Sequence, residues 1–128
     1  MTSVIIVDVR GVITKSGRDV LLRHAEYGAA LQRLKSDATL YVLSRDKVYN
    51  HFPSGELKII SAKSIFVFFK KGVQLLKSLE GPILLVSGDP WESFFASLLL
   101  RRISKKHTPI QVQLHADIGQ RHWLYQHA

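Results

Sequence analysis

The sequence predicts an α/β fold, namely a Rossmann-like, doubly wound parallel sheet of about five strands with helices on both faces. Three observations predict it. Short apolar runs alternate with longer amphipathic segments along the 128 residues. The first run, VIIVDV at residues 4–9, is apolar almost throughout, as in a strand buried on both faces. Glycine, proline and polar residues separate the segments. Successive βαβ units of this kind favour right-handed crossovers, and we expect the strand order 3-2-1-4-5.

The first half of the chain contains two expected strands and one helix. After a loop with Gly11 and Gly17, residues 19–35 repeat apolar side chains at helical spacing. The members of this stripe are Val20, Leu21, Ala25, Gly28, Leu31 and Leu34. Residues 39–44 (TLYVLS) are the second strand, and the polar residues 45–56 are a loop.

The second half repeats the alternation. The expected elements are strands at 57–61, 83–87 and 110–115, and helices at 63–79 and 90–106. The ending RHWLYQHA is typical of the first turns of a further helix. No linker or repeat divides the chain, and 46% hydrophobic residues suffice for one modest core. We therefore expect one domain, residues 1–128.

Composition limits the cellular compartment and the partners that we expect for the chain. The chain has no cysteine, which excludes disulfides and thiolate metal sites and suits a reducing cytoplasm. Neither a signal peptide nor an apolar stretch of about 18 residues, the length of a membrane span, is evident. The net charge of +8 favours an anionic partner: nucleic acid, an anionic membrane surface or a phosphorylated substrate. A solvated basic face is the plainer explanation.

The expected topology predicts where a ligand would bind. In such sheets the crevice lies at the carboxyl ends of the strands, where the strand order reverses. Three segments should meet there: the loop at residues 10–18, the turn after the fourth strand, and residues 115–119. Asp89 has a complete structural explanation as a helix cap, with Pro90 at the first helical position and Glu92 completing a capping box. At the crevice it could also accept hydrogen bonds from substrate hydroxyls.

The other polar candidates are weaker as motifs. RGVITKSGR has neither a dinucleotide fingerprint nor Walker A spacing, but its glycines could admit a substrate and its cations could meet phosphates. His115 ends an apolar strand two residues before Asp117, so it could bind or transfer a proton, or be an ordinary hydrogen-bonded residue. His122 and His127 lack the spacing of a zinc site, and we expect no metal.

The helix at residues 63–79 is strongly amphipathic. A Rossmann helix packed on its sheet, with lysines in water, explains this pattern. The alternative is a helix at an anionic bilayer, where phenylalanines and lysines bind together. The candidate residues for such a surface are Lys63, Phe66, Phe69, Lys70, Lys71 and Lys77.

Two motifs together resemble a known family. VSGDPWESF, followed about twenty residues later by QVQLHADIG, is similar to the N-terminal domain of GT-B-fold glycosyltransferases of the family 4-like group, in which such D-P and H-x-D elements end two strands. DVRGVITKSGRD is similar to that family's first βα loop. The resemblance covers essentially the whole chain.

The resemblance implies transfer of a sugar from a nucleotide-sugar to a glycan or lipid-linked acceptor, without a cofactor or bound metal. It implies that His115 acts at the reaction centre and that Asp89 and Asp117 form the acceptor wall. Ser16, Gly17 and Arg18 would line the cleft near the donor phosphate and acceptor. Family members often work at the cytoplasmic membrane face, which implies a cytoplasmic protein peripheral to the inner membrane.

The chain departs from the family in one large respect. The family's second domain binds the nucleotide-sugar through a pair of glutamates whose spacing no glutamates of this chain reproduce. The resemblance therefore implies a truncated domain, inactive in transfer by itself but able to hold an acceptor.

Two other functions stay open. IVDVRGVIT resembles the first motif of haloacid-dehalogenase-type phosphatases, with Asp8 as nucleophile, Ser44 in the second motif and Asp89 in the metal-binding one. Arg10, however, stands where that family has an acid/base aspartate, and arginine cannot cycle a proton. A basic, non-enzymatic module that binds nucleic acid or protein rests on net charge alone, because exposed aromatic residues interleaved with the cations on one face are not evident. Nucleic acid is therefore the less favoured partner.

Overall fold

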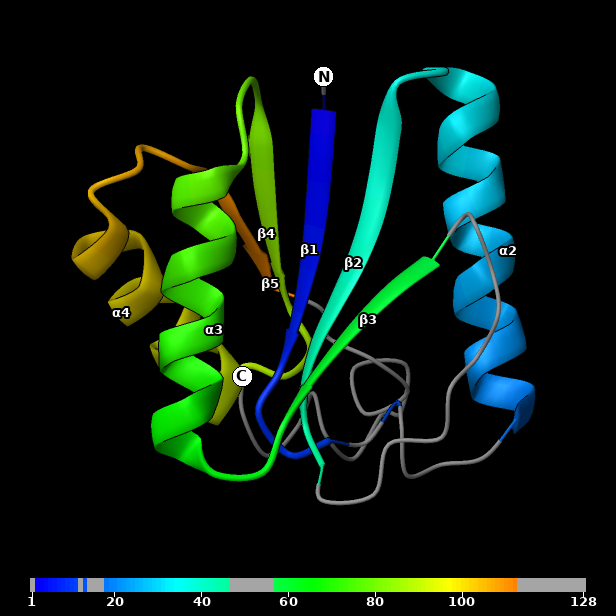
Figure 1. Cartoon of the computed structure of the whole chain (residues 1–128). Coiled ribbons are helices and arrows are strands. Elements are labelled where there is room, and N and C mark those ends of the chain that lie inside the picture. The colour runs from blue at the N-terminus through cyan, green and yellow to red at the C-terminus, as the bar shows by residue number, and fades with distance from the viewer. Residues whose placement is uncertain (1, 12, 14–17, 47–56, 113–128) are drawn as a thin grey trace, which may run out of the picture.

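The computed structural model describes residues 2–11, 13, 18–46 and 57–112 of the chain. Five strands form one sheet with the order β3-β2-β1-β4-β5, in which every pairing is parallel (Figure 1). The strands are β1 (Thr2–Asp8), β2 (Ala38–Arg45), β3 (Leu57–Ala62), β4 (Ile83–Ser87) and β5 (Ile110–Val112). The α/β Rossmann-like class and the predicted strand order are both confirmed.

Three long helices cover the sheet in the described part of the chain. They are α2 (Arg18–Leu34), α3 (Ile65–Ser78) and α4 (Glu92–Ser104). In Figure 1, α2 lies on one side of the sheet, and α3 and α4 lie together on the other. None of the described helices is long and apolar enough to cross a bilayer.

Two apolar layers hold these helices to the sheet. Because side chains alternate along a strand, β1 sends Ile5 and Val7 to one face and Ile6 to the other. Ile5 and Val7 belong to the layer with Phe68 of α3 and Leu100 of α4. Ile6 belongs to the second layer, where α2 contributes Val20, Ala25 and Leu31.

Helices α3 and α4 approach each other closely at Gly72. A Cβ atom there would lie 2.6 Å from Leu100 Cδ2 and 2.9 Å from Leu43 Cδ2. The glycine therefore leaves the space that Leu100 fills, which sets α4 directly beside α3.

Two details of the first helix and last strand differ from expectation. Leu34, placed with the apolar stripe of α2, is 87% exposed at the last position of the helix. The fifth strand is described as far as Val112, and the remainder of the expected strand, 113–115, lies outside the described residues.

Candidate functional site at the carboxyl edge of β1 and β4

The carboxyl ends of β1 and β4 lie side by side at the centre of the sheet. Val7 is in register with Ser87, and the Gly88 N–H donates to the Val7 carbonyl at 2.9 Å. A Cβ on Gly88 would lie only 3.0 Å from that carbonyl oxygen, so glycine lets the turn after β4 pass tightly against β1. The strand order reverses between these two strands, which makes their carboxyl ends the expected ligand position of the fold.

Asp89 anchors the start of α4. Its Oδ1 accepts hydrogen bonds from the backbone N–H groups of Trp91, at 2.8 Å, and Ser93, at 3.2 Å. Its Oδ2 accepts from the Ser93 hydroxyl at 2.7 Å. Each carboxylate oxygen accepts about two hydrogen bonds, and Oδ2 accepts one from the described residues, so one further acceptor position remains on it.

The predicted capping box at this turn is wrong, although Asp89 does bind the helix start. The helix begins at Glu92, and Trp91 before it has non-helical backbone angles (φ −113°, ψ −98°). Glu92 is thus the first helical residue rather than the third, and Pro90 precedes the helix. The reason is that residues 90–91 bend between β4 and α4, which carries the helix start toward the loop after β1.

Ser93 joins the helix start to that loop, and the sequence motifs did not single it out. Its side chain is fully buried, and its Oγ accepts the Val9 N–H at 3.1 Å while donating to Asp89. A serine in the first turn after an aspartate cap was the available signal, but serines at helix starts usually bond only to their own helix. The long-range partner is visible only in the tertiary structure.

An ion pair makes a second link between the same segments. The Arg10 guanidinium lies 3.3 Å from Glu92 Oε1. The two side chains are 53% and 51% exposed, so the pair is solvated and contributes little to stability.

The pKa of Asp89 lies below its ordinary value. Partial burial acts to raise the pKa, but the hydrogen bonds from Ser93 and from the N–H of Trp91, together with the nearby Arg10 charge, outweigh it. Asp89 is therefore a carboxylate, an acceptor and not a donor, at neutral pH.

Asp8 organises the first part of the loop after β1. Its carboxylate is almost fully buried, and Oδ2 accepts from the Ile13 N–H at 2.9 Å and from the Ser44 hydroxyl, at the end of β2, at 3.4 Å. The Gly11 N–H donates to the Asp8 carbonyl at 3.2 Å. From β2, Arg45 Nε donates to the Val9 carbonyl at 3.1 Å. The loop is thus held by the last residue of its own strand and by the end of β2.

Several of the predicted site residues lie outside the described part of the chain. These are Ser16, Gly17, His115 and Asp117. Arg18 is the first residue of α2, and its side chain is not described. Of the predicted substrate-binding residues, Asp89 is the one whose side-chain contacts the structure gives.

The residues proposed for a membrane surface on α3 do not share one face. Phe66 is 76% exposed, and Lys63, Lys70 and Lys77 are also exposed. Phe69 is half-buried and packs against the core. Lys71 donates from Nζ to the Ser61 carbonyl on β3 at 2.7 Å.

The described residues do not fit the magnesium site that the phosphatase resemblance implies. No group of three or more acidic or histidine side chains gathers within the described ranges. Arg10 brings a cation to the same edge, where it pairs with Glu92. Mg²⁺ prefers a shell of carboxylate, substrate and water oxygens, which this arrangement opposes.

The chain was compared with protein-family models, with curated proteins and with solved structures, and no match was found in any of the three.

Proposed function

We propose that this chain is the acceptor-binding domain of a glycosyltransferase that moves a sugar from a nucleotide-sugar to a glycan or lipid-linked acceptor. The observation that carries the proposal is the placement of Asp89 at the switch point of the sheet, ionised and with one acceptor position left on Oδ2. A buried or half-buried carboxylate that can accept from a hydroxyl is a common means of holding a sugar.

The direction of the strands supports the same proposal. β5 runs parallel to β4, and its last described residue, Val112, is in register with Ser87, the last residue of β4. His115 follows Val112 three residues later in the sequence. In the proposed reaction His115 contacts the sugar or acceptor at the reaction centre, and Asp117 joins Asp89 in the acceptor wall.

The remaining parts of the proposal rest on the resemblance. Ser16, Gly17 and Arg18 line the cleft near the donor phosphate, and a second domain supplies the nucleotide-sugar site. The reaction needs no further cofactor, and the proposal carries with it a cytoplasmic location. The chain by itself binds an acceptor but does not turn it over efficiently.

Binding of the chain to an array of glycans and polyprenyl-phosphate-linked sugars tests the proposal. We expect retention on a subset of the sugars. Asp89→Asn keeps a good helix cap but exchanges a charged for a neutral acceptor, so affinity should fall by about tenfold. Asp37→Asn, which removes a carboxylate from the opposite edge of the sheet, is the matched control and should bind normally.

Retention on no sugar, or an equal loss in the two variants, would contradict the proposal. Where the chain is joined to a nucleotide-sugar-binding domain, His115→Ala should lower turnover strongly and leave the thermal midpoint unchanged. Near-normal turnover would remove the role of His115.

One observation favours a second candidate, a haloacid-dehalogenase-like phosphatase. The Ser44 hydroxyl meets the Asp8 carboxylate at the ends of neighbouring strands, which is the order of that family's first two motifs. The poor fit for Mg²⁺ and the Arg10–Glu92 pair weigh against it. We expect no hydrolysis of p-nitrophenyl phosphate in the presence of Mg²⁺. Hydrolysis that Asp8→Asn abolishes would favour the phosphatase over the glycosyltransferase domain.

A further inference from the structure

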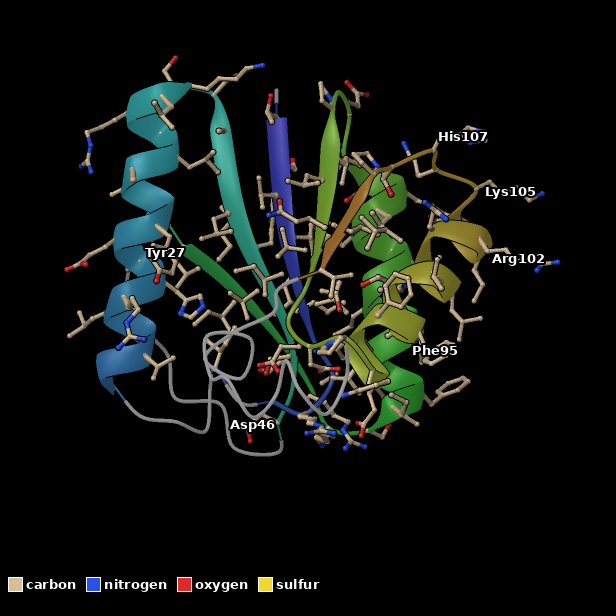
Figure 2. The ribbon with its side chains drawn as sticks, turned by 180° about the vertical axis from the view of Figure 1, so that it is seen from behind. Tyr27, Asp46, Phe95, Arg102, Lys105 and His107 are labelled. Carbon is tan, nitrogen blue, oxygen red and sulfur yellow. The ribbon has the colours of Figure 1, made fainter. Side chains whose placement is uncertain are left out.

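The exposed side of α4 and of its N-cap carries four large apolar side chains. Trp91, Phe95, Leu99 and Ile103 recur every four residues and are 56%, 64%, 48% and 51% exposed. Phe95, Leu99 and Ile103 lie above one another on the helix. Trp91 is the N-cap residue, and we include it as the first member of this stripe. Figure 2 shows Phe95 and Arg102 on the outer side of α4, pointing away from the sheet. A helix that covers a sheet normally turns polar residues to this side, so the stripe is not explained by the core.

Helix α3, which packs beside α4 on the same face of the sheet, adds a further exposed aromatic side chain. Phe66 is 76% exposed, and Lys70 and Lys77 follow it at helical spacing on the same flank. Lys71 points the other way, to β3, so the Phe66 flank is the one turned toward α4. We call Phe66, Trp91, Phe95, Leu99, Arg102 and Ile103 the α3–α4 surface.

The charge around this surface is one-sided. Between residues 63 and 107 the chain has eight lysines and arginines against three carboxylates. Of the three, Asp89 is bound to the first turn of α4 and Glu92 is paired with Arg10. The last turn of α4 carries Arg101 and Arg102, with Lys105 directly after it. An anionic bilayer complements such a surface, because its acyl region accepts the apolar side chains and its headgroups attract the cations at their margin.

We propose that the α3–α4 surface binds the interface of an anionic lipid bilayer. The stripe enters the boundary between headgroups and acyl chains, with α4 lying along the membrane, while Lys70, Lys77 and Arg102 meet lipid phosphates. A second copy of the chain is the poorer occupant, because two surfaces of the same positive charge repel each other. This binding is independent of sugar transfer.

The position of α4 gives the surface a consequence for the candidate site. The stripe begins at Trp91, two residues after Asp89, so the edge that carries Asp89 lies at the margin of the bound membrane. An acceptor anchored in the bilayer would then reach the crevice without leaving it. This route for the acceptor rests on the proposed function, whereas the membrane binding does not.

Sedimentation of the purified chain with vesicles tests the surface without a nucleotide-sugar. We expect binding to vesicles of phosphatidylcholine with phosphatidylglycerol, little binding to phosphatidylcholine alone, and weakening as salt rises. The double variant Phe95→Ser, Leu99→Ser should lower the partition coefficient by at least about tenfold, because two apolar side chains no longer leave water. Lys70→Gln and Arg102→Gln should each lower it by about fivefold.

The matched control lies on the other face of the sheet. Leu22→Ser with Leu34→Ser removes two exposed leucines of α2, which are 42% and 87% exposed, and should bind as the wild type does. Circular dichroism confirms that each variant is folded. Equal binding by the Phe95/Leu99 variant, no dependence on phosphatidylglycerol, or an equal loss in the α2 control would overturn the proposal. So would a dimer, seen by sedimentation equilibrium, that the Phe95/Leu99 variant abolishes, since it would assign the surface to a second copy.

Discussion

Helices α3 and α4 both begin at the carboxyl edge of the sheet, on the same face, but they begin in different ways. Ser64 caps α3 by local means: its backbone is extended (φ −133°, ψ 166°), and its Oγ accepts the Val67 N–H at 3.2 Å. The start of α4 is tied to the end of β1 and to the loop after it at three points, through Gly88 to Val7, Ser93 to Val9 and Glu92 to Arg10.

The start of α3 only caps its own helix, whereas the start of α4 is also part of the candidate site. A cap such as Ser64 satisfies the N–H groups of its own helix and can be exchanged without effect elsewhere. The β4–α4 turn instead fixes the relative position of two strand ends, and its carboxylate keeps one acceptor position for a partner.

Ser93→Ala should cause the largest loss of stability, about 2 kcal/mol, because it leaves the buried Val9 N–H without an acceptor. Urea unfolding followed by circular dichroism measures the change. Ser97→Ala is the control: Ser97 is equally buried on α4, but its hydroxyl donates only to the Ser93 carbonyl within the helix. Similar losses in the two variants would show that the link to β1 is not special.

Asp89→Ala should cost about 1.5 kcal/mol at pH 7, since two N–H groups and one hydroxyl lose their acceptor. The folded-state pKa of Asp89 is lowered, so the contribution of its charge is present above the unfolded pKa, near 3.8, and is lost as pH falls through the folded pKa. The difference from wild type should therefore shrink below about pH 4. Unfolding free energies measured from pH 7 down to pH 3 test this; a constant difference would contradict it.

Ser64→Ala should cost about 1 kcal/mol, the usual effect of losing a serine cap. The loss should not change between pH 7 and pH 3, because the hydroxyl does not titrate. Thermal unfolding of Ser64→Ala and Asp89→Ala at the two pH values compares the loss of a hydroxyl cap with the loss of a carboxylate that titrates. A pH-dependent loss at Ser64 would mean that the two helix starts are coupled.

Glu92→Gln should have the smallest effect, below about 0.5 kcal/mol, because both members of its ion pair are about half exposed to water. The small loss should disappear in high salt. A double-mutant cycle with Arg10→Gln gives the coupling free energy directly. A coupling above about 1 kcal/mol would show that this pair, and not Ser93, holds α4 to β1.

Much of the fold could be predicted from the chain itself. VIIVDV is apolar almost throughout because β1 is covered on both faces, and the alternation of strands and helices implied parallel pairing and the order of the strands. Leu34 was misplaced because periodicity does not say where the sheet beneath a helix ends. The start of α4 was misplaced because Asp-Pro-x-Glu satisfies capping rules at more than one position.

The location of the candidate site was predicted, but the contacts of its residues were not. Asp89 was found because aspartate before proline marks a helix start, and the topology assigned that start to the crevice. Ser93 was missed, since a serine within a first turn has several ordinary explanations. The apolar stripe of α4 was missed as well, because a helix with apolar residues on two sides does not reveal which side meets the core.

Local periodicity and the rules of chain connection are enough to predict the class of fold, the order of the strands and the position of Asp89. The buried face of α4, and the segments that its first turn joins, became known from the folded chain. Those outcomes depend on contacts between residues far apart in the chain, such as Val9 with Ser93 and Gly72 with Leu100, and a hydrogen bond or a close approach of that kind leaves no periodic mark in either segment.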